Sequence, residues 1–209
     1  MTFGALACLA AHAGDLQVSV LDKEGKPVQD AVVVLVPTGA GSPKTALAMR
    51  VAINQQNMRF VPAVSVVGVG AKGAFVNNDP WAHHVRASPA GFLEFDNSKG
   101  GFDLLLDGKP EGKAAKTGEA TFDKAGAILL GCHLHASMRG HVYVSDSPWA
   151  ALTGAEGTTT FEGVPSGAVS VKVWQADQLI AVPAQQIVVT DAPAKASVQL
   201  TVVPRRRRT

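Results

Sequence analysis

The chain has 209 residues, of which 46% are hydrophobic and 17% are charged, and this balance excludes an intrinsically disordered protein. Four of the 19 basic residues are the arginines at 205–208, so the rest of the chain is slightly acidic despite a formal net charge of +2, and no nucleic-acid partner is expected. The longest central apolar run, residues 31–36, is far shorter than the ~18 residues of a membrane-spanning helix.

The N-terminal segment has the features of an export signal. An apolar stretch ends in an A-x-A pattern at Ala13, which predicts a signal peptide over residues 1–13 and a periplasmic or secreted mature protein. Because the start lacks positive charge, a plain apolar N-terminal element stays open, as does lipid attachment at Cys8. Loss of the signal would leave Cys132 as a lone cysteine in an oxidising compartment, where it is buried, reactive or metal-bound.

Short strands separated by turn residues account for most of the remaining chain. The predicted strands are 16–22, 31–36, 60–69, 73–77, 91–95, 101–106, 125–132, 141–145, 158–161, 168–174, 185–190 and 196–203. Residues 45–58 fit either a short helix or an irregular crossing, and the polar segment 107–117 fits an exposed loop. Many short strands at this spacing predict an all-β protein built from β-sandwiches.

The predicted loop between the strands at 125–132 and 141–145 gathers metal-binding side chains. Cys132, His135 and Met138 stand there in a C-x-x-H-x-x-M pattern, and an earlier strand carries His83 at its end. A blue-copper centre uses two imidazoles and one thiolate in a plane, with a weak axial thioether. Because the sulfur ligands favour Cu(I) and the imidazoles hold Cu(II), this pattern indicates a one-electron copper site.

Other interpretations of these residues are weaker but stay open. Zinc is the rival metal, although the sequence lacks the paired C-x-x-C or H-x-x-x-H knuckles of structural zinc sites. Cys132 as an inert thiol or a nucleophile, and Met138 as a core residue, are further alternatives. We interpret His141 as an ordinary strand residue.

The motifs resemble those of the cupredoxin family over about residues 60–144. The chain has N-x-D-x-x-x-H-H-V at 77–85, F-D-K-x-G at 122–126 and G-C-x-x-H-x-x-M at 131–138. The spacing of the last motif is similar to that of amicyanin, and the combination is similar to bacterial cupredoxin-domain proteins often labelled methylamine utilization proteins. The resemblance implies a Greek-key β-sandwich, which we place at residues 40–148, with one type 1 copper.

The resemblance also implies the copper ligands, which are His83, Cys132, His135 and Met138. Neighbours on a strand point to opposite faces, so only one of the two adjacent histidines faces the metal, and the motif favours the first.

Three further residues are expected to support the ligands from behind or to replace one of them: His84, His133 and Asn78. The two histidines stand where the family often has Asn, Thr or Ser, and they are expected to link the ligand loops by hydrogen bonding or to supply extra nitrogen ligands.

A second small β-sandwich is predicted on either side of the copper domain. Residues 14–39 resemble the opening of a carboxypeptidase-regulatory-like module, with a D-x-x-G-x-P turn after the first strand. Its continuation, T-x-x-x-G-x-x-x-F followed by a V-P-x-G turn, occurs only within residues 149–203. We therefore predict one discontinuous sandwich interrupted by the copper domain, and a disordered basic tail at 204–209.

These features together predict an exported blue-copper electron carrier that exchanges electrons with protein redox partners. We expect no enzymatic activity, no catalytic residue and no transmembrane segment in the mature chain. A protein that stores, delivers or senses copper is the alternative function, and the excess of histidine near the site favours it slightly.

Overall fold

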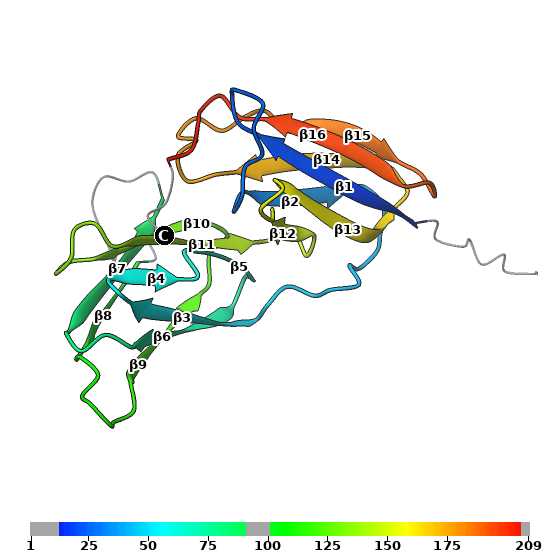
Figure 1. The fold of residues 1–209 in the computed structure, drawn as a ribbon. Coiled ribbons are helices and arrows are strands. Elements are labelled where there is room, and N and C mark those ends of the chain that lie inside the picture. The colour runs from blue at the N-terminus through cyan, green and yellow to red at the C-terminus, as the bar shows by residue number, and fades with distance from the viewer. Residues whose placement is uncertain (1–12, 91–100, 206–209) are drawn as a thin grey trace, which may run out of the picture.

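The computed structural model describes residues 13–90 and 101–205. Within these ranges the protein is built from strands alone, as Figure 1 shows, so the all-β prediction is confirmed. The strands are β1 (Ala13–Leu21), β2 (Val32–Pro37), β3 (Arg50–Gln56), β4 (Arg59–Val61), β5 (Val64–Gly68), β6 (Ala71–Asn77), β7 (His83–Pro89), β8 (Phe102–Leu106), β9 (Lys116–Phe122), β10 (Gly126–Cys132), β11 (Arg139–Ser145), β12 (Ala150–Leu152), β13 (Thr158–Pro165), β14 (Gly167–Trp174), β15 (Gln185–Val189) and β16 (Ala194–Gln199).

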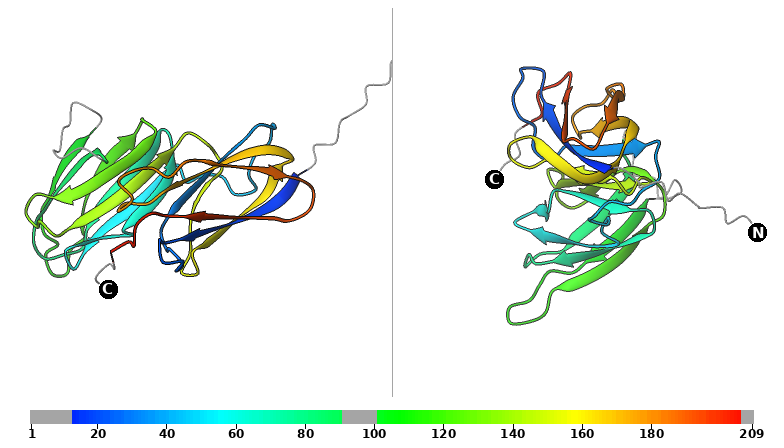
Figure 2. Two further views of the ribbon diagram at one scale, coloured as in Figure 1. Left: turned by 90° about the horizontal axis from the view of Figure 1, so that it is seen from above. Right: turned by 90° about the vertical axis from the view of Figure 1, so that its right-hand side faces the viewer.

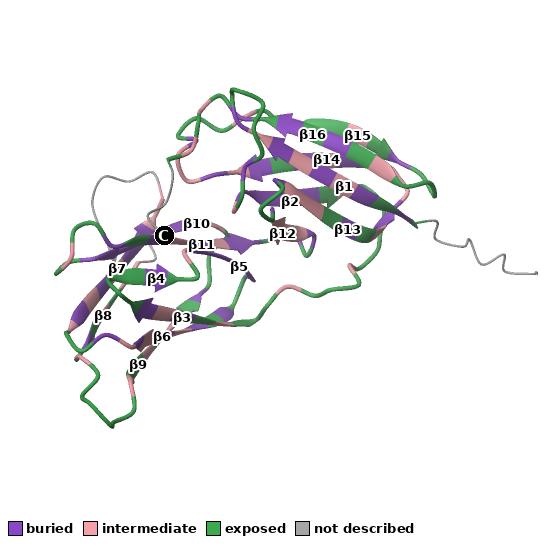
Figure 3. Cartoon of the chain, in the orientation of Figure 1, coloured by how far each residue is buried: buried purple, intermediate pink, exposed green. Residues whose placement is uncertain are grey.

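The middle of the chain forms two sheets that we call the metal-site sandwich. One sheet has the strand order β5-β11-β10-β7-β8 and the other has β4-β3-β6-β9. Their facing sides enclose a core that includes Phe60, Phe75 and Phe122, each at most 2% exposed. Alternate residues of the strands point into this core, and the banding along the strands in Figure 3 shows the alternation.

The two ends of the chain meet in a second pair of sheets, the flanking sandwich. Its sheets have the orders β13-β1-β16 and β12-β2-β14-β15. Strand β1 runs antiparallel to β13 and parallel to β16, so residues from opposite ends of the sequence lie side by side (Figure 1). Leu16, Val18 and Val20 of β1 are fully buried in a separate, largely aliphatic core.

A small contact joins the two sandwiches, which lie next to each other in Figures 1 and 2. Val64 of β5 packs against Val32 and Val34 of β2. Beside them the ring of Trp174 lies 5.7 Å from that of Tyr143 and 5.4 Å from that of His141. The contact is therefore apolar and aromatic, and it uses strand β11 of the metal-site sandwich.

Three local predictions need correction. Residues 45–58 contain strand β3 rather than a short helix or an irregular crossing, because pairing with β4 and β6 outweighs weak local preferences. The predicted loop 107–117 gives way at Lys116 to β9, a polar strand because it forms the edge of its sheet. The predicted strand 60–69 is divided into β4 and β5, with Pro62, which has no N–H to donate, between them.

Some predictions fall wholly or partly outside the described residues: the strand at 91–95, residues 1–12 of the signal peptide and residues 206–209 of the tail. In the described part, no helix has the length and apolar character needed to cross a membrane.

Candidate metal centre

Three potential ligand atoms converge at one end of the metal-site sandwich. His83 begins β7 and Cys132 ends β10, and these neighbouring antiparallel strands pair Cys132 with Val85. His135 lies on the loop that follows. The Sγ atom of Cys132 lies 3.6 Å from Nδ1 of His83 and 3.4 Å from Nδ1 of His135, and the two nitrogens are 3.1 Å apart. In the described part of the chain this is the one group of three or more His, Cys, Asp or Glu side chains close enough to hold a metal.

The geometry of these three atoms fits a metal ion. The point equidistant from them lies about 2 Å from each atom, which is the length of a metal–imidazole bond. Two imidazole nitrogens that face each other at 3.1 Å repel unless a proton or a cation lies between their lone pairs. A thiolate and two imidazoles form the trigonal set of a blue-copper centre.

The loop from Cys132 to Met138 is compact, and the two sulfur-bearing residues at its ends are buried. The Cys132 N–H donates to the Met138 carbonyl at 3.2 Å, and the Met138 N–H donates to the His135 carbonyl at 2.9 Å. Met138 is 1% exposed and Cys132 is 7% exposed, whereas His135 is half-buried. The site therefore has a buried sulfur side and one imidazole edge that reaches solvent.

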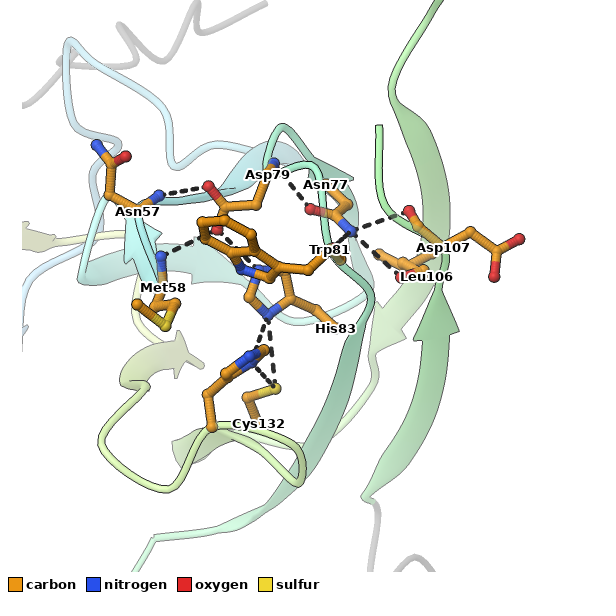
Figure 4. Close-up of polar contacts among 10 residues, drawn as sticks. Asn57, Met58, Asn77, Asp79, Trp81, His83, Leu106, Asp107 and Cys132 are labelled. Atoms are coloured by element: carbon orange, nitrogen blue, oxygen red, sulfur yellow. Dashed lines mark hydrogen bonds and ion pairs between the residues drawn. The ribbon is translucent and has the colours of Figure 1, made fainter. Parts of the chain in front are cut away.

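A buried carboxylate, whose role the sequence motif did not indicate, orients the buried histidine. Nε2 of His83 lies 2.8 Å from Oδ2 of Asp79, a contact drawn in the close-up of Figure 4. Both side chains are almost completely buried. An ionised carboxylate requires the proton on Nε2, so the Nδ1 lone pair faces Cys132 and His135. Such a carboxylate–histidine pair fixes the tautomer of a metal ligand.

A tight turn holds Asp79 in place. The two-residue turn between β3 and β4 has φ values of 54° at Asn57 and 56° at Met58, as in a type I′ hairpin turn. Its N–H groups donate to the two carboxylate oxygens of Asp79 at 2.6 and 2.9 Å (Figure 4). Burial by itself would raise the pKa of this carboxyl. The hydrogen bonds from Met58 first, and then from His83 and Asn57, outweigh burial and hold the pKa below its usual value.

Asn77 fixes the segment that connects β6 to His83. Its side chain is fully buried, and its amide nitrogen lies 2.9 to 3.2 Å from the carbonyl oxygens of Trp81, Leu106 and Asp107. Its amide oxygen accepts the N–H of Asp79 at 3.0 Å. The spacing of Asn77, Asp79 and His83 was visible in the sequence motif, but the roles of the first two residues were not.

The three residues expected to support or replace the ligands lie in different places. The His133 N–H donates to the His84 carbonyl at 2.9 Å, so the ligand loop and β7 are linked through the backbone. The two imidazole rings meet edge to face at 5.6 Å on the exposed side of the sheet, and His84 Nε2 contacts the carboxylate of Asp103. Asn78 instead donates to Asn54 on β3 at 3.0 Å.

Comparison with known proteins finds only distant structural likenesses. No known family profile and no curated protein matches the sequence. Amicyanin from Paracoccus versutus is 21% identical, with 53% of this chain and 97% of that chain covered and a TM-score of 0.36. A purple cupredoxin from Nitrosopumilus maritimus is 20% identical, with 46% and 98% covered and a TM-score of 0.32. These likenesses are too distant to transfer a function.

The donor atoms themselves decide the type of centre. The residues fit one type 1 copper. Thiolate and imidazole together suit copper and zinc, and the second potential sulfur ligand, Met138, is soft and favours copper over zinc. Within the described residues there is no second comparable cluster, so we expect one metal per chain.

Proposed function

We propose that this chain is a periplasmic or secreted copper protein that carries single electrons between redox partner proteins. The observation that carries the proposal is the convergence of Cys132 Sγ with Nδ1 of His83 and His135 at 3.1 to 3.6 Å. We propose these three residues and Met138 as the ligands. When bound there, copper would supply a one-electron couple between Cu(I) and Cu(II). The proposal includes no catalytic residue and no chemical conversion of a substrate.

The surroundings of the site support electron transfer, because they hold the ligands in place with little structural rearrangement. Asp79 holds His83 in one tautomer, and Asn77 and the β3–β4 turn hold Asp79. Cys132 belongs to a strand that pairs on both sides, with β7 and β11. Ligands fixed in this way keep nearly the same positions in both oxidation states, which lowers the reorganisation that electron transfer requires.

His135 supports a route for electrons to a partner. It is the half-buried histidine of the three-residue cluster, and exposed Leu134 precedes it on the same loop. An apolar surface beside an accessible imidazole edge suits brief contact with another protein. We therefore propose that redox partners dock over this loop.

The visible and electron paramagnetic resonance spectra of the copper-loaded protein test the proposal. An intense thiolate-to-copper band with a narrow copper hyperfine splitting is expected. Two adjacent residues provide matched variants: His83→Gln should abolish the band, whereas His84→Gln should leave it nearly unchanged. A colourless copper complex, or loss of the band only in His84→Gln, would contradict the ligand assignment.

Copper storage, delivery or sensing is a second candidate function. The imidazoles of partly exposed His84 and exposed His133 favour it, because they lie next to the ligand loop and offer a surface on which copper could first bind. Cyclic voltammetry and competition for Cu(I) distinguish the two functions. Reversible one-electron voltammetry supports the carrier, and rapid exchange of Cu(I) with a chelator supports copper handling.

We also propose the division into a discontinuous module, residues 14–39 and 149–203, and a copper domain at 40–148. The division is supported by the strand pairing, in which β1 and β2 pair only with β12 to β16 among the named strands. Separate hydrophobic cores in the two sandwiches also support it. Expression of residues 40–148 alone tests it, since a folded, coloured fragment is expected.

A further inference from the structure

A groove of about 500 Å³ lies where the chain crosses between the two sandwiches. The chain makes this crossing twice, from β2 to β3 and from β11 to β12 (Figure 1). Residues within 36–41 and 146–149 line the groove, together with Lys172 of β14. Lys172 is exposed, whereas its neighbours Val171 and Val173 are buried in the core of the flanking sandwich, so the groove lies on the outer face of that sheet.

Hydrogen bonds and close packing hold the walls of the groove in place. The Ser147 hydroxyl donates to the Leu35 carbonyl at 2.5 Å and accepts the Trp149 N–H at 3.2 Å. The Leu35 N–H donates to the Trp149 carbonyl at 2.8 Å. The other wall lies against Pro165 so closely that a Cβ atom at Gly41 would be 2.5 Å from Cγ of that ring. A ligand therefore does not have to order these segments when it binds.

Two opposite charges and a buried indole line the same groove. Lys172 and Asp146 are exposed, and in the part of the chain that the structure describes neither side chain forms an ion pair or a hydrogen bond, with the other or with a third residue. Trp149 is 3% exposed, and its indole N–H has no hydrogen-bond partner among the described residues. A buried indole N–H usually has a partner. The groove thus offers two donors and one carboxylate to a ligand.

We propose that this groove binds a small apolar zwitterion, namely a short peptide with both termini free. Lys172 and the Trp149 indole donate to its carboxylate, and Asp146 accepts from its ammonium group. Val36, which is 41% exposed, and Pro148 offer an apolar wall to its side chains. An anion without an ammonium group would be repelled by Asp146, and a cation without a carboxylate would be repelled by Lys172.

The size and place of the groove support such an occupant. Its volume lies within the range of about 300–1,000 Å³ that is typical of small-molecule sites, and such sites are frequent between domains. The proposal goes beyond the copper site and does not depend on it.

Equilibrium dialysis of the full chain with radiolabelled leucyl-leucine tests the proposal. Saturable binding is expected. The N-acetyl derivative lacks the ammonium group and the C-terminal amide lacks the carboxylate, so each should compete at least about tenfold more weakly than the unmodified dipeptide. Asp146→Asn and Lys172→Gln should weaken binding of the dipeptide by a similar factor. Asp146→Asn should also reduce the penalty for acetylation, and Lys172→Gln the penalty for amidation, because each variant lacks the charge that the derivative no longer needs.

Two exposed charges outside the groove provide matched controls. Lys195→Gln on β16 and Asp123→Asn between β9 and β10 should bind the dipeptide like the unchanged protein. Circular dichroism and thermal unfolding check that each variant is folded. Absence of saturable binding, or equal binding of the N-acetyl derivative, overturns the proposal. Unchanged binding in folded Lys172→Gln or Asp146→Asn overturns it as well, because the dipeptide would then bind elsewhere.

Discussion

Both sandwiches bury an aspartate that accepts hydrogen bonds from backbone N–H groups of a turn, but the two carboxylates have different roles. In the flanking sandwich, Oδ1 of Asp22 accepts the N–H groups of Glu24 and Lys26 and so closes its own turn. In the metal-site sandwich, Asp79 accepts two N–H groups from a turn on another strand and also contacts His83. A buried carboxylate is thus no sign of function by itself, whereas one aimed at a potential ligand is.

The two cores differ in the same way. The core of the flanking sandwich is aliphatic apart from Trp149 and Phe161, and its buried Thr153 serves the backbone, donating to the Val28 carbonyl and accepting the Ala31 N–H. The metal-site sandwich places a thiol, an imidazole and a carboxylate at one end of its core. We expect changes in the first core to alter stability alone, and changes at that end to alter metal binding.

The largest expected effect is that of Cys132→Ser. A serine hydroxyl is neither soft nor readily deprotonated, so the variant should lose the thiolate band entirely and bind Cu(I) at least about a hundredfold more weakly. Absorption spectra and chelator competition measure these effects. Because Cys132 is a small buried side chain, the fold should persist, and the circular dichroism spectrum checks this. Retention of the coloured band would exclude Cys132 as a ligand.

A change in the other core should affect stability without affecting the metal. Leu35 is fully buried in the flanking sandwich, and Leu35→Ala should lower the free energy of unfolding by about 2–5 kcal/mol. Denaturant unfolding measures the loss, and the spectrum of the copper-loaded folded protein should not change. A shifted spectrum in this variant would mean that the two sandwiches are coupled more strongly than their small contact indicates.

Asp79→Asn separates the orienting role from the ligand role. An amide cannot accept hydrogen bonds with both of its terminal atoms, so the N–H groups of Asn57 and Met58 and the His83 imidazole can no longer all be satisfied. Loss of such a partner typically weakens metal binding by about 10–100-fold. Asp103→Asn is the matched control, because Asp103 contacts the partly exposed His84 instead, and the copper affinity of this variant should stay within about twofold. Equal effects of the two changes would refute the assignment.

The all-β fold could be predicted from the sequence, because inward and outward side chains alternate along strands. The residues that cluster could also be predicted, because ligand chemistry depends on residue type. Glycine at position 126 of the F-D-K-x-G motif also has a local reason, since its φ of 128° is one that other residues rarely adopt. The role of Asp79 could not be predicted, because it depends on a turn at Asn57 and Met58 that is distant in sequence. Strand β9 was missed because an edge strand needs no hydrophobic pattern.

The smallest expected effect concerns the contact between the sandwiches, and the single tyrosine of the chain reports on it. Burial, and next to it the negative charge of Asp146, raises the pKa of Tyr143 above its ordinary value of 10.0. The folded state therefore favours the neutral phenol. This contribution to stability is fully present below pH 10 and is lost as the pH rises through the higher folded pKa.

Absorption of the tyrosinate band during alkaline titration measures this pKa directly. The midpoint of the native protein should lie above that of the protein in denaturant. Asp146→Asn should lower the native midpoint but leave part of the shift, because burial is the larger cause. Since the Tyr143 ring lies against Trp174 across the contact, a native midpoint equal to that of the unfolded chain would mean that the sandwiches separate while each stays folded. The two sandwiches would then have independent motions as well as independent cores.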